Sequence, residues 1–179
     1  MQFLTARTLL YFRVCFLATI TYFCLKDPSL IVSSGFVILL GQAMELPTVM
    51  VDTSNPIWGL LALAFGSLTI ADLVPLFADN IEYFESVVPA RLTVYFILGA
   101  YSFAGNSEFL CNNLVFVFAF FEIWFNFLIF NNLRDERYKR VKKLLEESEA
   151  RGEIDLKGLD QAGINQLMTE LLQQSRFNK

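Results

Sequence analysis

Apolar runs separated by short polar breaks dominate the first 131 residues of the chain. Three of them cover residues 9–25, 57–77 and 114–130, close to the length of about 20 residues that crosses the hydrocarbon core of a bilayer. A fourth covers residues 89–104 and opens with Pro89, a residue suited to the first turn of a helix. The pattern therefore predicts four membrane-spanning helices.

The run at residues 29–46 (SLIVSSGFVILLGQAMEL) is harder to assign. It is apolar enough to enter a bilayer but short, with Gln42 and Glu45 near its end and Pro47 after it. We interpret it as a short span, or as a re-entrant or interfacial helix. Residues 79–87 (DNIEYFESV) have the composition of an acidic loop. The predicted fold class is an all-α polytopic membrane protein with four spanning helices, one short membrane helix of ambiguous placement and a helical tail.

Positive charge is divided unevenly along the chain. Only four of the 14 Lys and Arg residues precede residue 132, and six of the others lie within residues 134–143. We therefore expect a transmembrane domain at residues 1–131 and a charged tail at residues 132–179. Because Lys and Arg concentrate on the cytosolic side of spans, we expect the tail in the cytosol. Four spans would place the N-terminus there too, with Arg7, and five would place it across the membrane.

The tail contains a second candidate helix after a break at Gly152. Its apolar residues recur three and four positions apart, which is typical of a helix with one buried face. Such a short helix cannot bury that face alone, so we expect it to dock on the membrane domain, on the first tail helix or on a partner. The residues of this face are Ile164, Leu167, Met168, Leu171 and Leu172.

A carboxylate lies deep within the last apolar run. Glu122 is about eight residues, or ~12 Å, from the nearer end of that run, which is beyond the reach of its side chain to water. An isolated carboxylate there costs ~2.5 kcal/mol or more, so it must be neutral, paired or hydrated. Asn126 lies one turn further along the same face. Arg13 in the first run has the donors to bind a carboxylate, and we favour an Arg13–Glu122 pair over the alternative, Arg13–Asp72.

Such a pair has two interpretations. It fixes helix packing, or it belongs to a proton or ion relay, and we favour packing because one buried pair accounts for both residues. Asp72 lies near the end of its run, before Pro75, where we expect it to cap or kink the helix at the membrane surface. Arg91 follows Pro89 closely, and we expect its long side chain to reach the interface.

Two further features concern the packing of helices. Gly59, Ala62 and Gly66 recur at helical spacing and predict a small-residue stripe that lets another helix approach closely. Glu45, within GQAMELP, is expected at a polar notch beside the short segment. For this notch we favour the geometry of a short hairpin over a binding site.

Composition narrows the classes of function. The chain is 55% hydrophobic, with 19 Phe and no His, and Cys15, Cys24 and Cys111 lie far apart without CxxC spacing. Neither a zinc site nor a thioredoxin-like motif is supported. No nucleophile–base pair or phosphate-binding Gly loop is present, so we expect a protein that is not an enzyme, with no cofactor and no metal. The net charge of −4 is an average over unlike halves and indicates no nucleic-acid partner.

Four blocks of the sequence resemble one fungal family. They are residues 11–27 (YFRVCFLATITYFCLKD), 41–47 (GQAMELP), 72–92 (DLVPLFADNIEYFESVVPARL) and 121–136 (FEIWFNFLIFNNLRDE). Their order and spacing are similar to those of the family named for increased loss of mitochondrial DNA. The resemblance implies a small multispanning protein of the endoplasmic reticulum whose loss in yeast disturbs maintenance of the mitochondrial genome. It implies no biochemical activity and no catalytic residues.

We therefore expect a non-catalytic subunit in the endoplasmic reticulum membrane that packs against lipids and a larger membrane protein. Its role would lie in lipid handling or membrane homeostasis, with an indirect effect on mitochondrial DNA. The alternative is a small channel or transporter that uses Glu122, Asn126 and Asp72 as a polar path. A lipid-modifying enzyme ranks last, because the sequence has no catalytic constellation.

Overall fold

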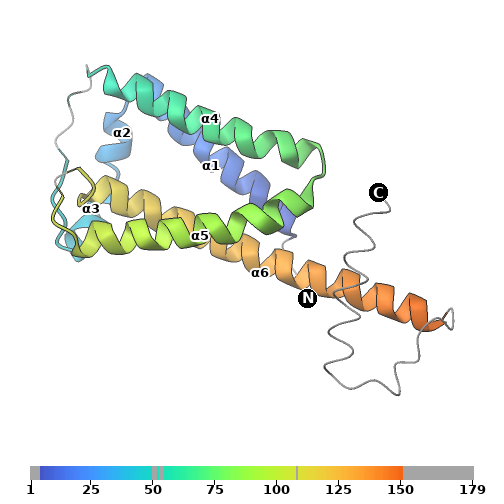
Figure 1. Cartoon of the computed structure of the whole chain (residues 1–179). Coiled ribbons are helices and arrows are strands. Elements are labelled where there is room, and N and C mark those ends of the chain that lie inside the picture. Colours follow the sequence, from blue (N-terminus) through green and yellow to red (C-terminus); the bar gives the residue numbers. More distant parts are fainter. Residues whose placement is uncertain (1–4, 50–51, 53–54, 108, 151–179) are drawn as a thin grey trace. The chain divides into compact units, whose positions relative to one another are not determined.

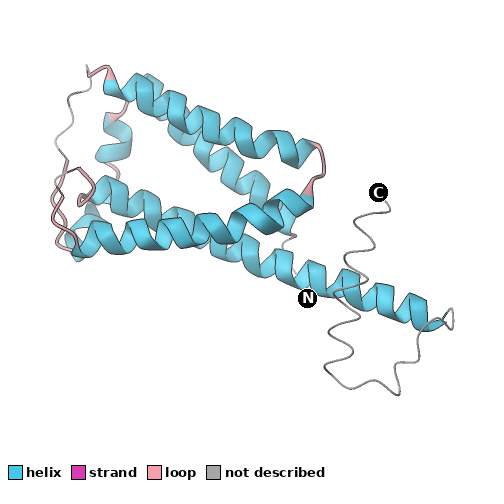
Figure 2. Ribbon diagram, in the orientation of Figure 1, coloured by secondary structure: helices cyan, strands magenta, loops and turns pink. Residues whose placement is uncertain are grey.

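The computed structural model describes residues 5–49, 52, 55–107 and 109–150, the last four of these by backbone only. This part of the chain contains helices and no strand (Figure 1, Figure 2). The chain divides into two compact units, Met1–Asn132 and Leu133–Lys179. The helices are α1 (Ala6–Lys26), α2 (Ser29–Val32), α3 (Gly35–Ala43), α4 (Ile57–Phe77), α5 (Ile81–Ala104) and α6 (Asn113–Ala150).

Four of the described helices are long and apolar enough to cross a membrane. They are α1, α4, α5 and the Asn113–Glu146 part of α6. The predicted all-helical fold class with four candidate spans is thereby confirmed. α1 begins earlier than its apolar run because Thr5 caps it, its Oγ accepting a hydrogen bond from the Thr8 backbone N–H at 3.3 Å.

Residues 29–46 do not form one helix. α2 has 4 residues and α3 has 9, so neither approaches the length of about 20 residues that spans a bilayer. α3 ends where Glu45 adopts a φ of 53° and the Leu46 N–H donates to the Gly41 carbonyl at 2.9 Å. This is the usual hydrogen bond of a helix that ends in a left-handed residue. The interpretation of residues 29–46 as one continuous span is therefore wrong. Their placement as a re-entrant or interfacial segment stays a prediction.

α5 begins at Ile81 and not at Pro89, so the acidic loop assigned to residues 79–87 is also wrong. Asn80 caps the helix, its Oδ1 accepting from the Tyr83 N–H at 3.1 Å, and Glu82 lies in the first turn, where negative charge is favourable. Pro89 lies inside the helix, where it removes one backbone hydrogen bond. Arg91 is consequently ten residues, or ~15 Å, into α5.

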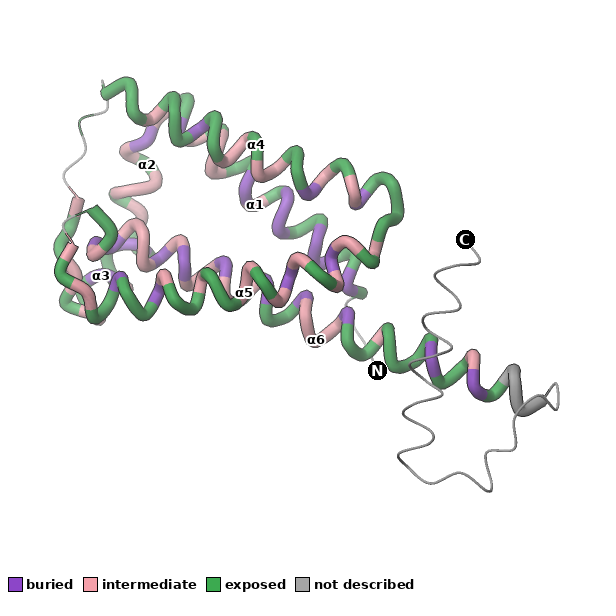
Figure 3. The backbone as a smooth tube through the Cα atoms, viewed as in Figure 1, coloured by how far each residue is buried: buried purple, intermediate pink, exposed green. Residues whose placement is uncertain are grey.

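Aromatic side chains pack α6 against the other helices of the Met1–Asn132 unit. Tilted and edge-on ring pairs of this kind add about 0.5–1.5 kcal/mol beyond the burial of their area. Buried positions follow α1 and α6 in particular (Figure 3). The contacts, with ring centroids 5.1–5.9 Å apart, are Phe16–Phe121, Phe36–Phe121, Phe65–Phe118 and Tyr95–Phe118.

Gly41 of α3 packs directly on the start of α6. A Cβ at Gly41 would lie 2.8 Å from the Cβ of Asn113, and Asn113 also holds the segment after α3 through its N–H to the Pro47 carbonyl at 3.2 Å. We expect Gly41→Ala to lower the free energy of unfolding by about 1–3 kcal/mol, because neither backbone can give way cheaply. The midpoint of thermal unfolding in detergent measures this. Gly59→Ala is the matched control, since nothing lies within 4 Å of its Cβ position. Equal midpoints for the two variants would contradict the close contact.

The Leu133–Lys179 unit is described as far as the end of α6. In this part Val141 and Leu145 are buried, one turn apart on the helix. The predicted docking face of the tail, at residues 164–172, lies outside the described residues. It stays a prediction.

Candidate functional site

Arg13 lies at the centre of a buried charge network. Its side chain, on α1, is 1% exposed, and its Nε and Nη2 both donate to Glu122 Oε2 on α6, at 3.0 and 2.9 Å. The same guanidinium forms an ion pair through Nη1 with Asp72 Oδ2 on α4. The two ion pairs that the sequence presents as alternatives therefore occur together.

Asp72 has a second cationic partner on α5. Arg91 Nη1 lies 2.6 Å from Asp72 Oδ1, and the Asp72 side chain is only 2% exposed. Asp72 thus links three helices and does not cap α4 at the membrane surface, so that expectation is wrong. The interfacial placement of Arg91 is wrong too, because α5 starts eight residues before Pro89 and carries Arg91 to the depth of Asp72.

Asn126 extends the network along α6. Its Nδ2 donates to the Glu122 backbone carbonyl at 2.7 Å and to Glu122 Oε2 at 2.9 Å. The spacing of four residues places these two side chains on one face of the helix, so the sequence could indicate the contact. Tyr95 of α5 interacts electrostatically with Glu122 and Arg13. Sequence reasoning missed Tyr95, since an aromatic residue in an apolar run gives no signal of a polar contact.

The charges of the network balance. Two guanidinium groups and two carboxylates give a formal charge of zero, and each charged group faces at least one group of opposite sign. A single unpaired charge at the centre of a membrane helix costs about 2.5–3.5 kcal/mol on insertion scales, and a buried partner offsets that cost. Because α1, α4, α5 and α6 each contribute a charged residue, the network joins all four candidate spans.

One side of the Glu122 carboxyl group carries all of its hydrogen bonds. Arg13 Nε, Arg13 Nη2 and Asn126 Nδ2 converge on Oε2. Glu122 Oε1 and Asn126 Oδ1 are buried and have no hydrogen-bond partner among the described residues. A carboxylate offers about four lone-pair positions, so Oε1 retains the capacity to accept a hydrogen bond or a proton.

The small-residue stripe on α4 lies partly against α1. A Cβ at Gly66 would contact the Thr21 methyl group at 3.6 Å, and Ala62 is 2% exposed. Gly59 faces open space. At Gly66 the stripe therefore serves packing within the chain.

A pocket of about 440 Å³ adjoins the notch at the end of α3. Glu45 lines it together with Ser102 of α5 and Cys111. The Cys111 Sγ accepts from the Ser107 N–H at 3.3 Å and faces the Tyr101 carbonyl at 3.4 Å. These bonds hold the connection between α5 and α6, in keeping with a structural role for the notch.

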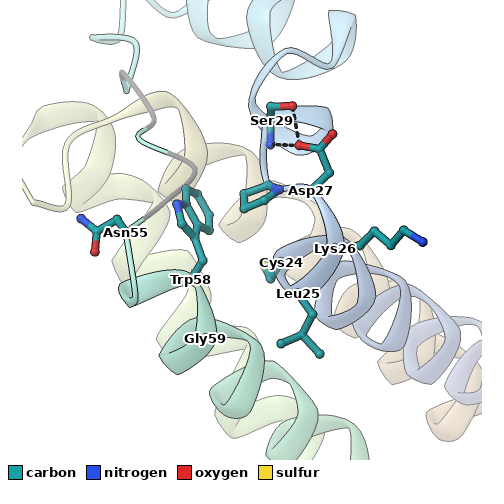
Figure 4. A pocket seen from close by; sticks show the side chains of 9 residues that line it. Cys24, Leu25, Lys26, Asp27, Ser29, Asn55, Trp58 and Gly59 are labelled. Carbon is teal, nitrogen blue, oxygen red and sulfur yellow. Dashed lines mark hydrogen bonds between the residues drawn. The ribbon is translucent and has the colours of Figure 1, made fainter.

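A second pocket, of about 600 Å³, lies between the end of α1 and the start of α4 (Figure 4). Polar side chains that line it shape these helix ends. Asp27 Oδ1 accepts from the backbone N–H and the hydroxyl of Ser29, at 3.0 and 2.5 Å. Trp58 Nε1 donates to the Asp52 carbonyl at 3.1 Å.

Four helices of spanning length, joined by a buried and charge-balanced network, define a multispanning helical membrane protein. Within that class, the chain belongs to the family described as increased loss of mitochondrial DNA protein 1, whose sequence model matches residues 4–109. This family is linked to the maintenance of mitochondrial DNA. The matched residues include Arg13, Asp72 and Arg91, whereas Glu122 and Asn126 lie beyond them.

Two fungal relatives match most of the chain. Protein ILM1 of Saccharomyces cerevisiae is 42% identical over 144 residues, which are 80% of this chain and 71% of that protein. Protein ilm1 of Schizosaccharomyces pombe is 30% identical over 148 residues, which are 81% of this chain and 92% of that protein. No solved structure gives a significant match.

Proposed function

We propose that the chain is a non-catalytic accessory subunit of a larger complex in the endoplasmic reticulum membrane. The observation that carries this proposal is the charge network, in which Arg13, Arg91, Asp72 and Glu122 neutralise one another. Each ionisable side chain of the network is thus engaged in joining helices. The role would be in lipid handling or membrane homeostasis, and the link to mitochondrial DNA would be indirect.

The proposed orientation places the C-terminus in the cytosol. The six Lys and Arg residues at positions 134–143 follow the last apolar run directly, and cationic residues near span ends favour the cytosolic side. With four spans the N-terminus lies on the same side. The ion pair between Arg7, near the start of α1, and Asp79, between α4 and α5, supports this arrangement because it brings two expected cytosolic ends together at 2.5 Å.

Affinity purification from native membranes tests the accessory role. After extraction with a mild detergent, the tagged chain should co-purify with a second membrane protein. The native mass of the purified complex should exceed that of the chain alone in its detergent belt. Crosslinking before extraction should join the two proteins. An unrelated tagged four-span protein from the same membranes is the control. A clean monomer with no crosslinked partner would contradict the proposal.

A second candidate function, a small channel or transporter, is favoured by one observation. Glu122 Oε1 and Asn126 Oδ1 are buried acceptors without hydrogen-bond partners in the described part of the chain, as in a polar path for a proton or cation. Purified protein in liposomes would then carry an ion flux that Glu122→Gln abolishes. The neutral charge of the network argues against a cation site, so we rank this function second.

A further inference from the structure

The indole of Trp124 lies far from both ends of the apolar part of α6, which is unusual for a side chain with an N–H donor. Trp124 is on α6, eleven residues after Asn113 and ten before Arg134, so ~15 Å of helix separates it from either end of the apolar part. Tryptophan in membrane proteins concentrates at the two interfaces, where its N–H can reach water or headgroups. Trp124 is instead near the middle of the hydrocarbon region, with 52% of its surface exposed.

The other tryptophan of the chain shows the usual arrangement. Trp58 lies in the first turn of α4 (Figure 4). Its Nε1 donates to the Asp52 carbonyl at 3.1 Å. The contact of Trp124 is a ring contact with Phe120 at 6.4 Å, and its N–H meets no acceptor among the described residues. Lipid chains offer none either, and an unsatisfied N–H in an apolar medium is unfavourable.

Trp124 belongs to a continuous apolar face of α6. Phe127 is 47% exposed and Leu128 is 38% exposed, and they follow Trp124 by three and four residues, the spacing of one helix face. The face directed into the bundle carries Glu122 and Asn126, both fully buried. α6 therefore joins its own bundle on one side and presents a large aromatic surface on the other.

We propose that the face of α6 formed by Phe120, Trp124, Phe127 and Leu128 binds a transmembrane helix of a different subunit, whose oxygen atom accepts a hydrogen bond from Trp124 Nε1. This inference rests on the proposed accessory function and names its docking surface. The partner helix carries Ser or Thr at this depth, or a small residue that brings a backbone carbonyl close. Aromatic residues of this kind are frequent anchors of protein interfaces.

The chemistry of the face argues against face-to-face docking of a second copy. A second copy that docked through the same face would offer only Phe, Trp and Leu side chains to the indole, and none of these has an oxygen acceptor. The tail at residues 151–179 carries eight charged residues, so its sequence is too polar to enter the hydrocarbon region. A partner helix with a hydroxyl or a close carbonyl meets the requirement.

Trp124→Phe tests the proposal, because it removes the N–H and keeps an aromatic ring. We expect the amount of partner that co-purifies per chain to fall about three- to twentyfold, the range that corresponds to one hydrogen bond between membrane helices. Phe96→Leu is the control, since Phe96 is an exposed aromatic residue on α5. It should leave the recovered partner unchanged, and the thermal midpoint of each variant should match that of the parent chain.

A photoreactive residue at position 124 supplies the second measurement. We expect it to crosslink to a transmembrane peptide of the same protein that co-purifies with the parent chain, and the same residue at position 96 should not. A crosslink to a second copy, a crosslink to lipid alone, or full partner recovery with Trp124→Phe would overturn the docking surface. If the partner binds independently of Trp124, the accessory function stands and this inference fails. If no partner is recovered with the parent chain, both fail.

Discussion

Arg13→Met should lower the free energy of unfolding by about 3–5 kcal/mol, because it leaves two buried carboxylates without their shared cation. Glu122 would lose its ion pair altogether, since its cationic partner among the described residues is Arg13, and Arg91 pairs with Asp72. Methionine keeps much of the volume of the arginine stem, so the effect reports charge more than packing. The midpoint of thermal unfolding in detergent should fall by roughly 6–20 °C for a chain of this size.

Arg7→Met on the same helix is the matched control for Arg13→Met. Arg7 also has a carboxylate partner, Asp79, but their side chains are 49% and 65% exposed. Exposed ion pairs contribute about 0–1 kcal/mol, so this variant should unfold close to the parent midpoint. Equal effects of the two substitutions would contradict the central place of Arg13 in the network.

Exchanging the charges of the first pair, with Arg13→Glu and Glu122→Arg, should not rescue the fold. For an isolated pair the exchange would preserve the attraction. Here it places a carboxylate at position 13 beside Asp72, because Arg13 contacts both acids in the parent chain. We expect the double variant to be at least as unstable as Arg13→Met, since like charges at short range repel strongly in a medium of low dielectric constant.

The abundance and thermal midpoint of the exchanged variant measure this, with each single variant alongside. Recovery to the parent midpoint would mean that Arg13 and Glu122 form a separate pair and that Asp72 is bound by Arg91 alone.

The four candidate spans and the depth of Glu122 within its apolar run could be predicted from the sequence for a simple physical reason. Lipid imposes a minimum length on an apolar helix, and a short acidic side chain cannot reach water from the middle of one. Both limits depend only on the residues of a single apolar segment, so they can be applied to the sequence of that segment alone. They also restrict the partners of Glu122 to the few cations within the apolar part, of which Arg13 is one.

The pair between Arg91 and Asp72 could not be predicted, because it depends on where a neighbouring helix begins. Pro89 is a residue suited to the first turn of a helix, and a helix that began there would make Arg91 shallow and leave Arg13 as the candidate cation for Asp72. Asn80 is the actual cap, and α5 tolerates Pro89 eight residues after the helix begins. The two competing signals, the cap and the proline, are both present in the sequence, and the helix begins at the cap.

The central claim is that the buried charges join the helices and do not form a proton or ion relay. An apolar replacement of the whole network tests this claim most directly. The variant combines Arg13→Met, Arg91→Met, Glu122→Met and Asp72→Leu, which removes the charges and retains most of the volume. Replacing a complete buried ion network by apolar residues is often neutral or stabilising, in contrast to removing one member. The measurement is the amount of partner recovered per chain with this fourfold variant after mild extraction. The account predicts recovery near the parent level, because the charges serve only to join helices. A stable fourfold variant that fails to hold its partner would contradict it.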